Sequence, residues 1–446
     1  MSKKWLSLLM AGAMVASMAV PVMAEEETEP DNTITGDSSA DDAFVVWGWN
    51  DDIKNILDTV FAEAYPEEYS RIVFVNTGGS DYYQTKLDAV LDDPSNELYP
   101  DLMGLEVDYV QKYTNSDWLL SVTDIGITED DMANMYQYNI DLGSDYDGNV
   151  KALFWQATPG CYAVRADLAE KYLGTTDPDE VAAYFTDLDT IIATAEMVNE
   201  ASGGTCKLFS GYDEIKRSLM NSREVGFYDE NDVITLDENV TTYFETAKTL
   251  YDSDLTYNTS QWSADWYANM DGDGEESNAA LAYFGCPWFV YWSLSDTWQG
   301  NTILVAAQEQ CFWGGTGLAA TAQCADTDLA AKIMQCLACD TDSMVAINAQ
   351  NADFVNNTAA IEAIVESGAS ADGNGYMYNA DQNFIEFFLD KADAIDASTV
   401  TAEDQTILSL LDTECQAYVT GEKDLDTALA DLTSAIHDTY SYLSVE

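Results

Sequence analysis

The chain has 446 residues, and its 17 Lys and Arg against 80 Asp and Glu give a formal net charge of -63. Such a field repels nucleic acids and anionic lipids, because binding them requires clustered basic residues, so a nucleic-acid partner is excluded. The 47% hydrophobic and 12% aromatic content predicts packed cores instead of disorder, and the length suits two domains or one large one.

The N-terminus has the pattern of an export signal. Lys3 and Lys4 precede an apolar run over residues 5–20, followed by Pro-Val-Met-Ala at 21–24. A basic region, an apolar run and a small-residue site predict a signal peptide over residues 1–24. A membrane anchor is the alternative, but the run is short and interrupted. No cysteine lies near this site, so we expect an exported protein (extracellular, cell-surface or periplasmic) without a lipid-anchor cysteine.

Residues 25–42, EEETEPDNTITGDSSADD, predict a disordered acidic tether. Beyond them, apolar runs of strand type alternate with helical spacing. Strands are predicted at 44–49 and 72–77, and residues 99–105 predict a turn that runs into a third buried strand. Helices are predicted between them at 53–69 and 85–93. This alternation predicts a mostly parallel α/β sheet, which binds ligands at the carboxyl ends of its strands. Residues 47–52, 77–83 and 106–109 are therefore expected near a ligand.

The pattern changes near residue 155, and this change predicts a second domain. Residues 150–168 predict two strands with a break at Thr158-Pro159-Gly160, and the chain becomes mainly helical from Asp177 onward. A strand-like segment at 301–310 runs into FWGGTGLAA at 312–320. Glycine allows the backbone to approach closely and an aromatic ring offers a flat apolar face, so this stretch suits a ligand site.

The cysteines do not predict a metal site. Export makes disulfides possible for the eight cysteines, but their spacing gives no connectivity. Cys336 and Cys339 form a CxxC in an apolar helical pattern, where buried small residues are the simpler interpretation, and the single histidine, His437, is far away.

An acidic segment imitates calcium ligation. Asn269, Asp271, Asp273 and Gly274 resemble the start of an EF-hand loop, but Ala280 occupies the position of its bidentate glutamate. An acidic loop is the simpler interpretation. No metal and no cofactor are therefore expected.

The order of several motifs is familiar. They are VVWGWNDD, YPDLMGLEVDYVQKY, VKALFWQATPGCYAVRADLAEKYLGTTDPDEV, SGYDEI, NTSQWSADWYANM, FWGGTGLAA, NADFVNN and YVTGEKDLDTALADL. In this order the chain resembles the carbohydrate-type extracellular solute-binding proteins of ABC importers (family 1, the maltose-binding-protein group), over nearly all of its mature length. Two features depart from that pattern: no lipid-anchoring cysteine is seen, and Gly317 stands where many relatives have tryptophan.

The resemblance implies a type II periplasmic-binding-protein-like fold, in which two α/β lobes joined by crossing segments close over a ligand. It implies an N-terminal lobe of residues 43–154 plus 311–347 and a C-terminal lobe of residues 155–310 plus 348–446. It also matches Asp108 to a ligand-contacting aspartate of the maltose-binding branch.

A sugar site needs aromatic planes against the C–H face of a pyranose and polar groups along its hydroxyl edge. The residues expected to supply them are Trp47, Asn50, Asp51, Asp108, Trp155, Gln156, Tyr212, Asp213, Trp262, Trp288, Trp313, Gly314 and Gly315. Any one tryptophan is as well suited to a core, Asp213 to a helix cap, and Trp262 with Trp266 to one helix face. The glycine pair is expected to bring backbone donors to a hydroxyl beneath Trp313.

No GxSxG, HExxH or P-loop motif is present. We therefore expect a non-enzymatic monomer that captures a neutral sugar or oligosaccharide and delivers it to the permease subunits of an ABC importer. A secreted glycoside hydrolase is the alternative, because two carboxylates suffice for that chemistry, as is a surface sugar receptor not coupled to transport.

Overall fold

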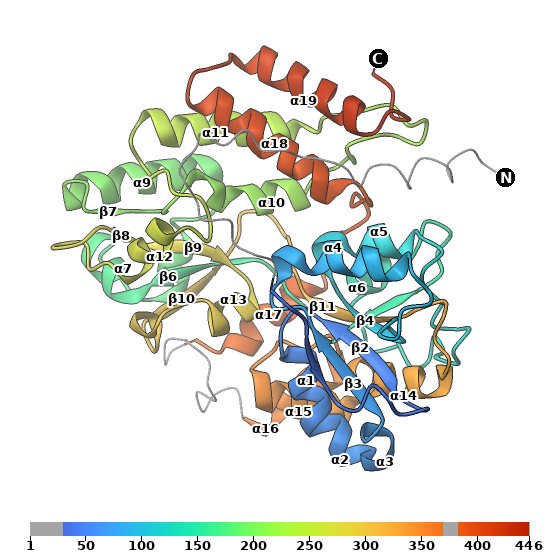
Figure 1. Ribbon diagram of the computed structural model, residues 1–446. Coiled ribbons are helices and arrows are strands. Elements are labelled where there is room, and N and C mark those ends of the chain that lie inside the picture. The colour runs from blue at the N-terminus through green and yellow to red at the C-terminus, as the bar shows by residue number, and fades with distance from the viewer. Residues whose placement is uncertain (1–29, 369–381, 446) are drawn as a thin grey trace.

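The computed structural model describes residues 30–368 and 382–445, which form two α/β lobes (Figure 1). The predicted signal peptide and the first residues of the predicted tether lie outside this range. The first lobe is built on a six-stranded sheet of order β1-β3-β2-β4-β11-β5, and the second on a three-stranded sheet of order β10-β6-β9. Within the described residues, no helix has the length and apolarity needed to span a membrane.

The centre of the first lobe follows the predicted alternation. Strand β2 (Phe44–Gly48) pairs in parallel with β3 (Ile72–Asn76) and β4 (Leu102–Glu106), and every residue of β2 is buried. The helical segments around these strands are α1 (Asp52–Ile56), the π-helix η2 (Leu57–Phe61), α2 (Ala62–Ala64), α3 (Pro66–Tyr69), α4 (Ser80–Leu91), the 3-10 turn η3 (Val107–Tyr109), α5 (Val110–Thr114) and α6 (Gln137–Leu142). The predicted strands of this region are confirmed. Of the predicted helices, the one over 85–93 begins earlier, at Ser80, and the one over 53–69 is divided into α1, η2, α2 and α3.

Two expectations for this sheet are wrong. Part of the predicted tether is ordered, since β1 (Thr33–Thr35) pairs antiparallel with β3 and places Ile34 opposite Val75. The sheet is also not mostly parallel, because β11 (Thr316–Ala320) pairs antiparallel with both β4 and β5 (Ala152–Phe154). The chain enters β11 directly from the second lobe. Parallel pairing needs a crossover connection, usually a helix, and none leads into β11.

The second lobe has an antiparallel sheet of β6 (Cys161–Arg165), β9 (Ala282–Gly285) and β10 (Thr302–Ala306), and a short parallel pair of β7 (Cys206–Lys207) and β8 (Ala279–Ala280). Its helical segments are α7 (Ala166–Tyr172), α8 (Pro178–Ala182), α9 (Leu188–Ser202), η4 (Tyr212–Ile215), α10 (Lys216–Asn221), α11 (Glu238–Asp252), α12 (Ala264–Asp271), α13 (Pro287–Trp292), η5 (Asp296–Trp298), α18 (Asp404–Val419) and α19 (Leu425–Thr439). The predicted helical character of this half is confirmed.

Four further helices lie between β11 and α18: α14 (Thr327–Ala338), α15 (Thr341–Asn351), α16 (Thr358–Ser367) and α17 (Phe384–Ala392). Helix α14 packs against β11 and β5, and α15 against η2, so both cover the first lobe. Helix α15 continues past residue 347, where the sequence placed a lobe boundary. The CxxC motif lies at the end of α14, and all eight cysteines of the chain are free thiols.

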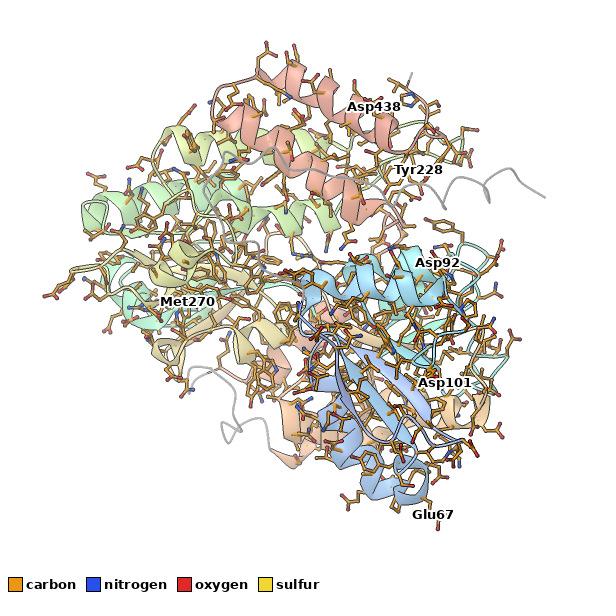
Figure 2. All side chains as sticks on the ribbon, in the orientation of Figure 1. Glu67, Asp92, Asp101, Tyr228, Met270 and Asp438 are labelled. Carbon is orange, nitrogen blue, oxygen red and sulfur yellow. The ribbon has the colours of Figure 1, made fainter. Side chains whose placement is uncertain are left out.

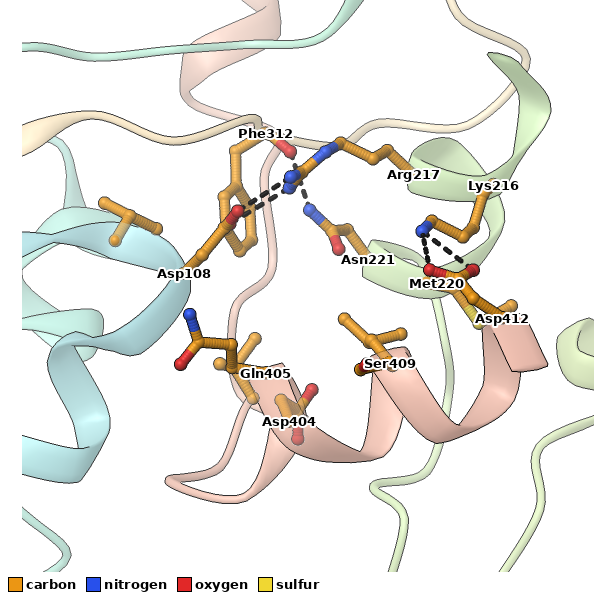
Figure 3. A pocket seen from close by; sticks show the side chains of 13 residues that line it. Asp108, Lys216, Arg217, Met220, Asn221, Phe312, Asp404, Gln405, Ser409 and Asp412 are labelled. Atoms are coloured by element: carbon orange, nitrogen blue, oxygen red, sulfur yellow. Dashed lines mark hydrogen bonds and ion pairs between the residues drawn. The ribbon is translucent and has the colours of Figure 1, made fainter. Parts of the chain in front are cut away.

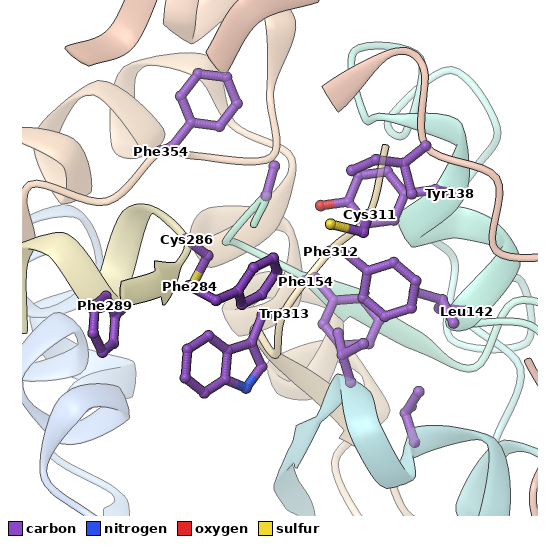
Figure 4. Close-up of a cluster of buried hydrophobic side chains, with 14 of the residues drawn as sticks. Tyr138, Leu142, Phe154, Phe284, Cys286, Phe289, Cys311, Phe312, Trp313 and Phe354 are labelled. Carbon is purple, nitrogen blue, oxygen red and sulfur yellow. The ribbon is translucent and has the colours of Figure 1, made fainter. Parts of the chain in front are cut away.

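The lobes are joined by three crossing segments, which we define as residues 155–160, 307–315 and 352–357. Backbone bonds link them: Ala157 N donates to Phe354 O (2.8 Å), and Trp313 N donates to Thr158 O (3.0 Å). In Figure 4, Phe312 and Trp313 project to opposite sides of the middle crossing. Phe312 stacks on Tyr138 of the first lobe, while Trp313 packs on Phe284 and Phe289 of the second.

Acidic residues spread over the outside of the molecule, as exposed Glu67, Asp92 and Asp438 illustrate (Figure 2). Several acidic residues instead lie inside, and Asp404 is one of them. Asp404, the first residue of α18, accepts a bond of 2.5 Å from Arg223, and the side chains of this ion pair are 8% and 1% exposed. The Arg223 guanidinium also lies 3.9 Å above the Phe227 ring. This buried pair fastens α18 to the segment after α10.

Replacing Asp404 by Asn should lower the free energy of unfolding by roughly 3–5 kcal/mol, because it leaves the Arg223 charge buried without its partner. Urea unfolding followed by circular dichroism measures this. The matched control is Asp412→Asn, which breaks the more exposed pair with Lys216 and should cost under about 1 kcal/mol. Equal losses in the two variants would contradict the assignment.

Candidate ligand-binding site between the lobes

A pocket of about 210 Å³ lies between the lobes (Figure 3). The first lobe contributes Val107 and Asp108 at the carboxyl end of β4, which is where a parallel sheet presents its functional groups. The second lobe and the middle crossing contribute the remaining lining residues: Lys216, Arg217, Met220, Asn221, Phe312, Val400, Asp404, Gln405, Leu408, Ser409 and Asp412.

The polar contact at the centre of the pocket joins the two lobes. Arg217 of α10 donates to both carboxylate oxygens of Asp108, at 3.0 and 2.7 Å. The same guanidinium lies 4.8 Å above the Trp313 ring. Next to it, Asn221 Nδ2 donates to Phe312 O at 2.6 Å. Arg217 is therefore held from three directions: by its own helix, by the opposite lobe and by the middle crossing.

The charges in the pocket balance. Lys216 donates to both carboxylate oxygens of Asp412 at 2.9 and 2.8 Å, Arg217 pairs with Asp108, and Asp404 pairs with Arg223. Each of these basic groups thus already has an acidic partner. Such a lining offers hydrogen-bonding groups of both kinds without a net charge to attract an anion.

The carboxyl group of Glu106 lies behind this ion pair. It accepts a bond from Asp108 N at 2.8 Å, which caps the η3 turn. Burial raises the pKa of Glu106 well above its usual range, and the neighbouring Asp108 charge raises this pKa further, while Arg217 opposes both effects. The raised pKa favours the protonated form of Glu106, and that form can donate a hydrogen bond as well as accept one.

The glycine pair makes room for these groups. Gly314 has a φ of +62°, and a Cβ atom there would lie 2.6 Å from Glu106 Oε1 and 3.3 Å from Trp288 Nε1. Its carbonyl oxygen accepts a bond from Thr158 Oγ1 at 2.6 Å, and the carbonyl of Gly315 accepts one from Val107 N. The carbonyls of the pair therefore serve the packing of the crossing, and the expectation that its backbone donors approach a ligand stays a prediction.

Gly314→Ala should destabilise the protein by about 1–2 kcal/mol beyond any effect of Gly148→Ala. Both glycines have positive φ, but nothing lies within 4 Å of a Cβ atom at Gly148, so that variant reports the backbone cost alone. Thermal unfolding of the two variants beside the wild type measures the difference. Equal melting temperatures would show that Glu106 and Trp288 adjust without cost.

Three predicted tryptophans meet in one aromatic cluster beside the Arg217–Asp108 pair. The Trp262 ring lies 5.5 Å from the Trp313 ring and 6.3 Å from the Trp288 ring, and the Trp262 and Trp288 rings are nearly parallel. Trp288 Nε1 donates to Trp313 O at 2.9 Å. Trp313 is buried, whereas Trp262 is 44% exposed, so the cluster has one face open to a ligand.

Asp213 makes a loop contact that the sequence did not predict, and its expected ligand contact stays a prediction. Its carboxylate accepts a bond from Gln261 N at 2.9 Å, and the next residue, Trp262, has a φ of +69°. Positive φ is unfavourable for a residue as large as tryptophan and persists only where neighbours impose it. Asp213 thus positions the loop that presents Trp262, and Tyr212 lies half-buried beside it.

Two predicted tryptophans are in the core instead. Trp47 of β2 is 3% exposed and its indole donates to Leu98 O, and Trp155 is 1% exposed. Both tryptophans are buried because β2 and the first crossing are each covered on both faces. These two expectations are corrected. Asn50 and Asp51 do lie at the carboxyl ends of the strands, where Asn50 bonds Asp52, and Asp51 accepts a bond from Asn76.

The Gln156 side chain joins the first crossing to the third crossing and to the start of β11, so its amide is already engaged. Its Nε2 donates to Asp353 of the third crossing at 2.7 Å, and its Oε1 accepts a bond from Thr316 N, directly after the middle crossing, at 2.9 Å. Asp353 is 2% exposed. Burial raises the pKa of Asp353 to about 7, and the nearby charge of Asp52 contributes to that rise.

The pKa of Asp353 predicts a specific pH dependence. A carboxyl whose folded pKa is raised loses stability as pH rises from its unfolded pKa, near 4, to its folded pKa of about 7. Asp353→Asn removes that loss while keeping an acceptor for Gln156. The variant should be more stable than the wild type by roughly 2–4 kcal/mol at pH 8 and by much less at pH 5. Denaturant unfolding at both pH values tests this, and parallel pH profiles would contradict it.

Sequence reasoning missed Arg217 and Asp353, and it included Glu106 only within the range 106–109 expected near a ligand. Arg217 carried a usable signal, since it is one of only four arginines in a chain of strong negative charge. Glu106 carried a weaker one, because it ends a buried strand two residues before Asp108. Asp353 carried none, because its partners come from segments far away in the sequence.

Comparison with known proteins gives similarity at the level of structure. No family model matches the chain, and neither does any curated protein. Similar solved structures include an extracellular solute-binding protein of family 1, with 16% identity, a TM-score of 0.74, and coverage of 90% of this chain and 100% of that one. The similarity extends over both lobes.

Two further structures have ligands in their descriptions. The GacH receptor of Streptomyces glaucescens GLA.O, solved unliganded and with acarbose, has 16% identity, a TM-score of 0.67, and coverage of 90% of this chain and 98% of that one. An ABC-transporter-associated binding protein from B. animalis subsp. lactis Bl-04, solved with β-1,6-galactobiose, has 16% identity, a TM-score of 0.71 and coverage of 91% and 99%. The chain has the two-lobed type II fold of these binding proteins, so the predicted fold class is confirmed.

Proposed function

We propose that this protein captures a neutral sugar or short oligosaccharide between its lobes, without chemical change, and presents it to the permease of an ABC importer. One observation carries the proposal: a charge-balanced polar pocket lined by both lobes lies beside an aromatic cluster with an open face. Polar groups of both kinds suit hydroxyls, and indole faces suit the C–H face of a pyranose. The ligands named for similar structures, acarbose and β-1,6-galactobiose, belong to the same chemical class.

The pocket volume of about 210 Å³ is below the roughly 300–1,000 Å³ of typical small-molecule sites, so the site must open further for anything beyond a single ring. Movement of the lobes about the crossings would supply that space. A carrier that closes over its solute needs no nucleophile. Asp108 has both oxygens engaged by Arg217, which suits a binding contact better than a catalytic carboxylate.

The test is thermal unfolding of residues 25–446 with neutral mono- and oligosaccharides, including β-1,6-galactobiose and acarbose, followed by calorimetric titration of each sugar that stabilises. Each sugar is recovered afterwards and analysed for cleavage. Saturable stabilisation by one intact sugar class is the expected result, because a ligand that binds only the folded state raises its melting temperature. Recovered cleavage products would instead support the hydrolase, and no stabilisation across the panel would overturn the sugar assignment.

Trp288→Ala should weaken binding of the identified sugar about tenfold, since an aromatic contact contributes about 1 kcal/mol beyond the area that it buries. The matched control is Trp292→Ala on the same helix, one turn further on, where the side chain is 60% exposed. The control should bind within twofold of the wild type. Similar losses in both variants would mean that α13, and not the Trp288 ring, determines affinity.

A further inference from the structure

The Arg217–Asp108 pair spans the boundary between the lobes. Arg217 belongs to α10 of the second lobe, and Asp108 follows β4 of the first. The adjacent residue, Lys216, pairs with Asp412 of α18 and stays within the second lobe. Of these two neighbouring cations on α10, Arg217 forms an ion pair that resists separation of the lobes, whereas Lys216 does not.

Further contacts lie along the same side of the boundary. Gln84 of α4 donates to Gln405 of α18 at 3.1 Å, and Ala402 N donates to Tyr146 Oη at 2.9 Å. These are single neutral hydrogen bonds at exposed positions, which exchange readily with water. The Arg217 contact is stronger, because it is bidentate, charge-assisted and only 22% and 30% exposed at its two side chains.

The Arg217 guanidinium is also pre-oriented for its contact with Asp108. It rests on the Trp313 ring, whose backbone is bonded to the first crossing, so the cation is oriented by the connection about which the lobes would turn. A planar guanidinium that already stacks on a ring loses less freedom when it binds a carboxylate.

We propose that the Arg217–Asp108 pair is a latch that holds the two lobes together in the empty protein. The latch occupies both oxygens of Asp108, the residue matched to a ligand contact, so a sugar gains access to this carboxylate only when the latch is released. This second statement rests on the proposed function, whereas the latch itself is a property of the ligand-free protein and is tested without a sugar.

The experiment is small-angle X-ray scattering of ligand-free residues 25–446, comparing the radius of gyration of the wild type with those of Arg217→Gln, Asp108→Asn and Lys216→Gln. Arg217→Gln and Asp108→Asn should both enlarge the radius, by similar amounts, and their double variant should enlarge it no further because the two act on one contact. Lys216→Gln should match the wild type, and Arg217→Lys should be intermediate because a lysine lacks the bidentate fork.

Salt provides a readout that needs no substitution. Raising NaCl from 0.05 to 1 M weakens a partly exposed ion pair, so the wild-type radius should rise toward that of Arg217→Gln, while the variant should not respond. A salt-independent wild-type radius overturns the latch, even if the variants fold poorly. The latch is also overturned if Lys216→Gln enlarges the radius of gyration as much as Arg217→Gln does. Sugar binding that fails in a protein with a working latch would overturn the proposed function alone.

Discussion

The structure depends on the hydrogen bonding of three crossing segments to one another. Because the backbone of the first crossing bonds both of the others, the lobes meet in a fixed register. The Gln156 side chain adds a bond to Asp353 of the third crossing and one to Thr316 at the start of β11. The position of Asp108 opposite Arg217, and of Trp313 beneath that arginine, follows from this register. A pocket made by two lobes can be specific only if the lobes return to the same alignment.

The charge of the chain makes its few cations informative. With 17 basic residues against 80 acidic ones, a lysine or arginine has many possible partners. The structure places Arg223 in the interior against Asp404, and Arg217 across the lobes against Asp108. In both places a planar cation also lies over an aromatic ring, Phe227 or Trp313. The acidic surface serves solubility, whereas these two arginines determine geometry.

Much of the fold could be predicted from the sequence, because strand and helix periodicity are local properties. Phe44–Gly48 and the alternation after it are readable in this way, as is the break at Thr158-Pro159-Gly160. The antiparallel entry of β11 was not readable, since a strand's direction depends on where the chain comes from and not on its composition. The site was only partly predictable for the same reason. Asp108 ends a strand and could be found, but the partners of Gln156 and Asp353 are distant in sequence. Trp47 shows that a tryptophan near a strand end can equally belong to the core.

The strand order β4-β11-β5 has a consequence for how the chain acquires its fold. Strands β4 and β5 are made early but are joined only through β11, which follows every strand of the second lobe in the chain. Until β11 arrives, β4 presents an unpaired edge and β5 has no neighbour in the sheet. Such edges pair readily with other chains, and closing contacts of long sequence separation is slow. The sheet of the first lobe is therefore completed only after every strand of the second lobe has been made, and until then its open edge needs protection during synthesis.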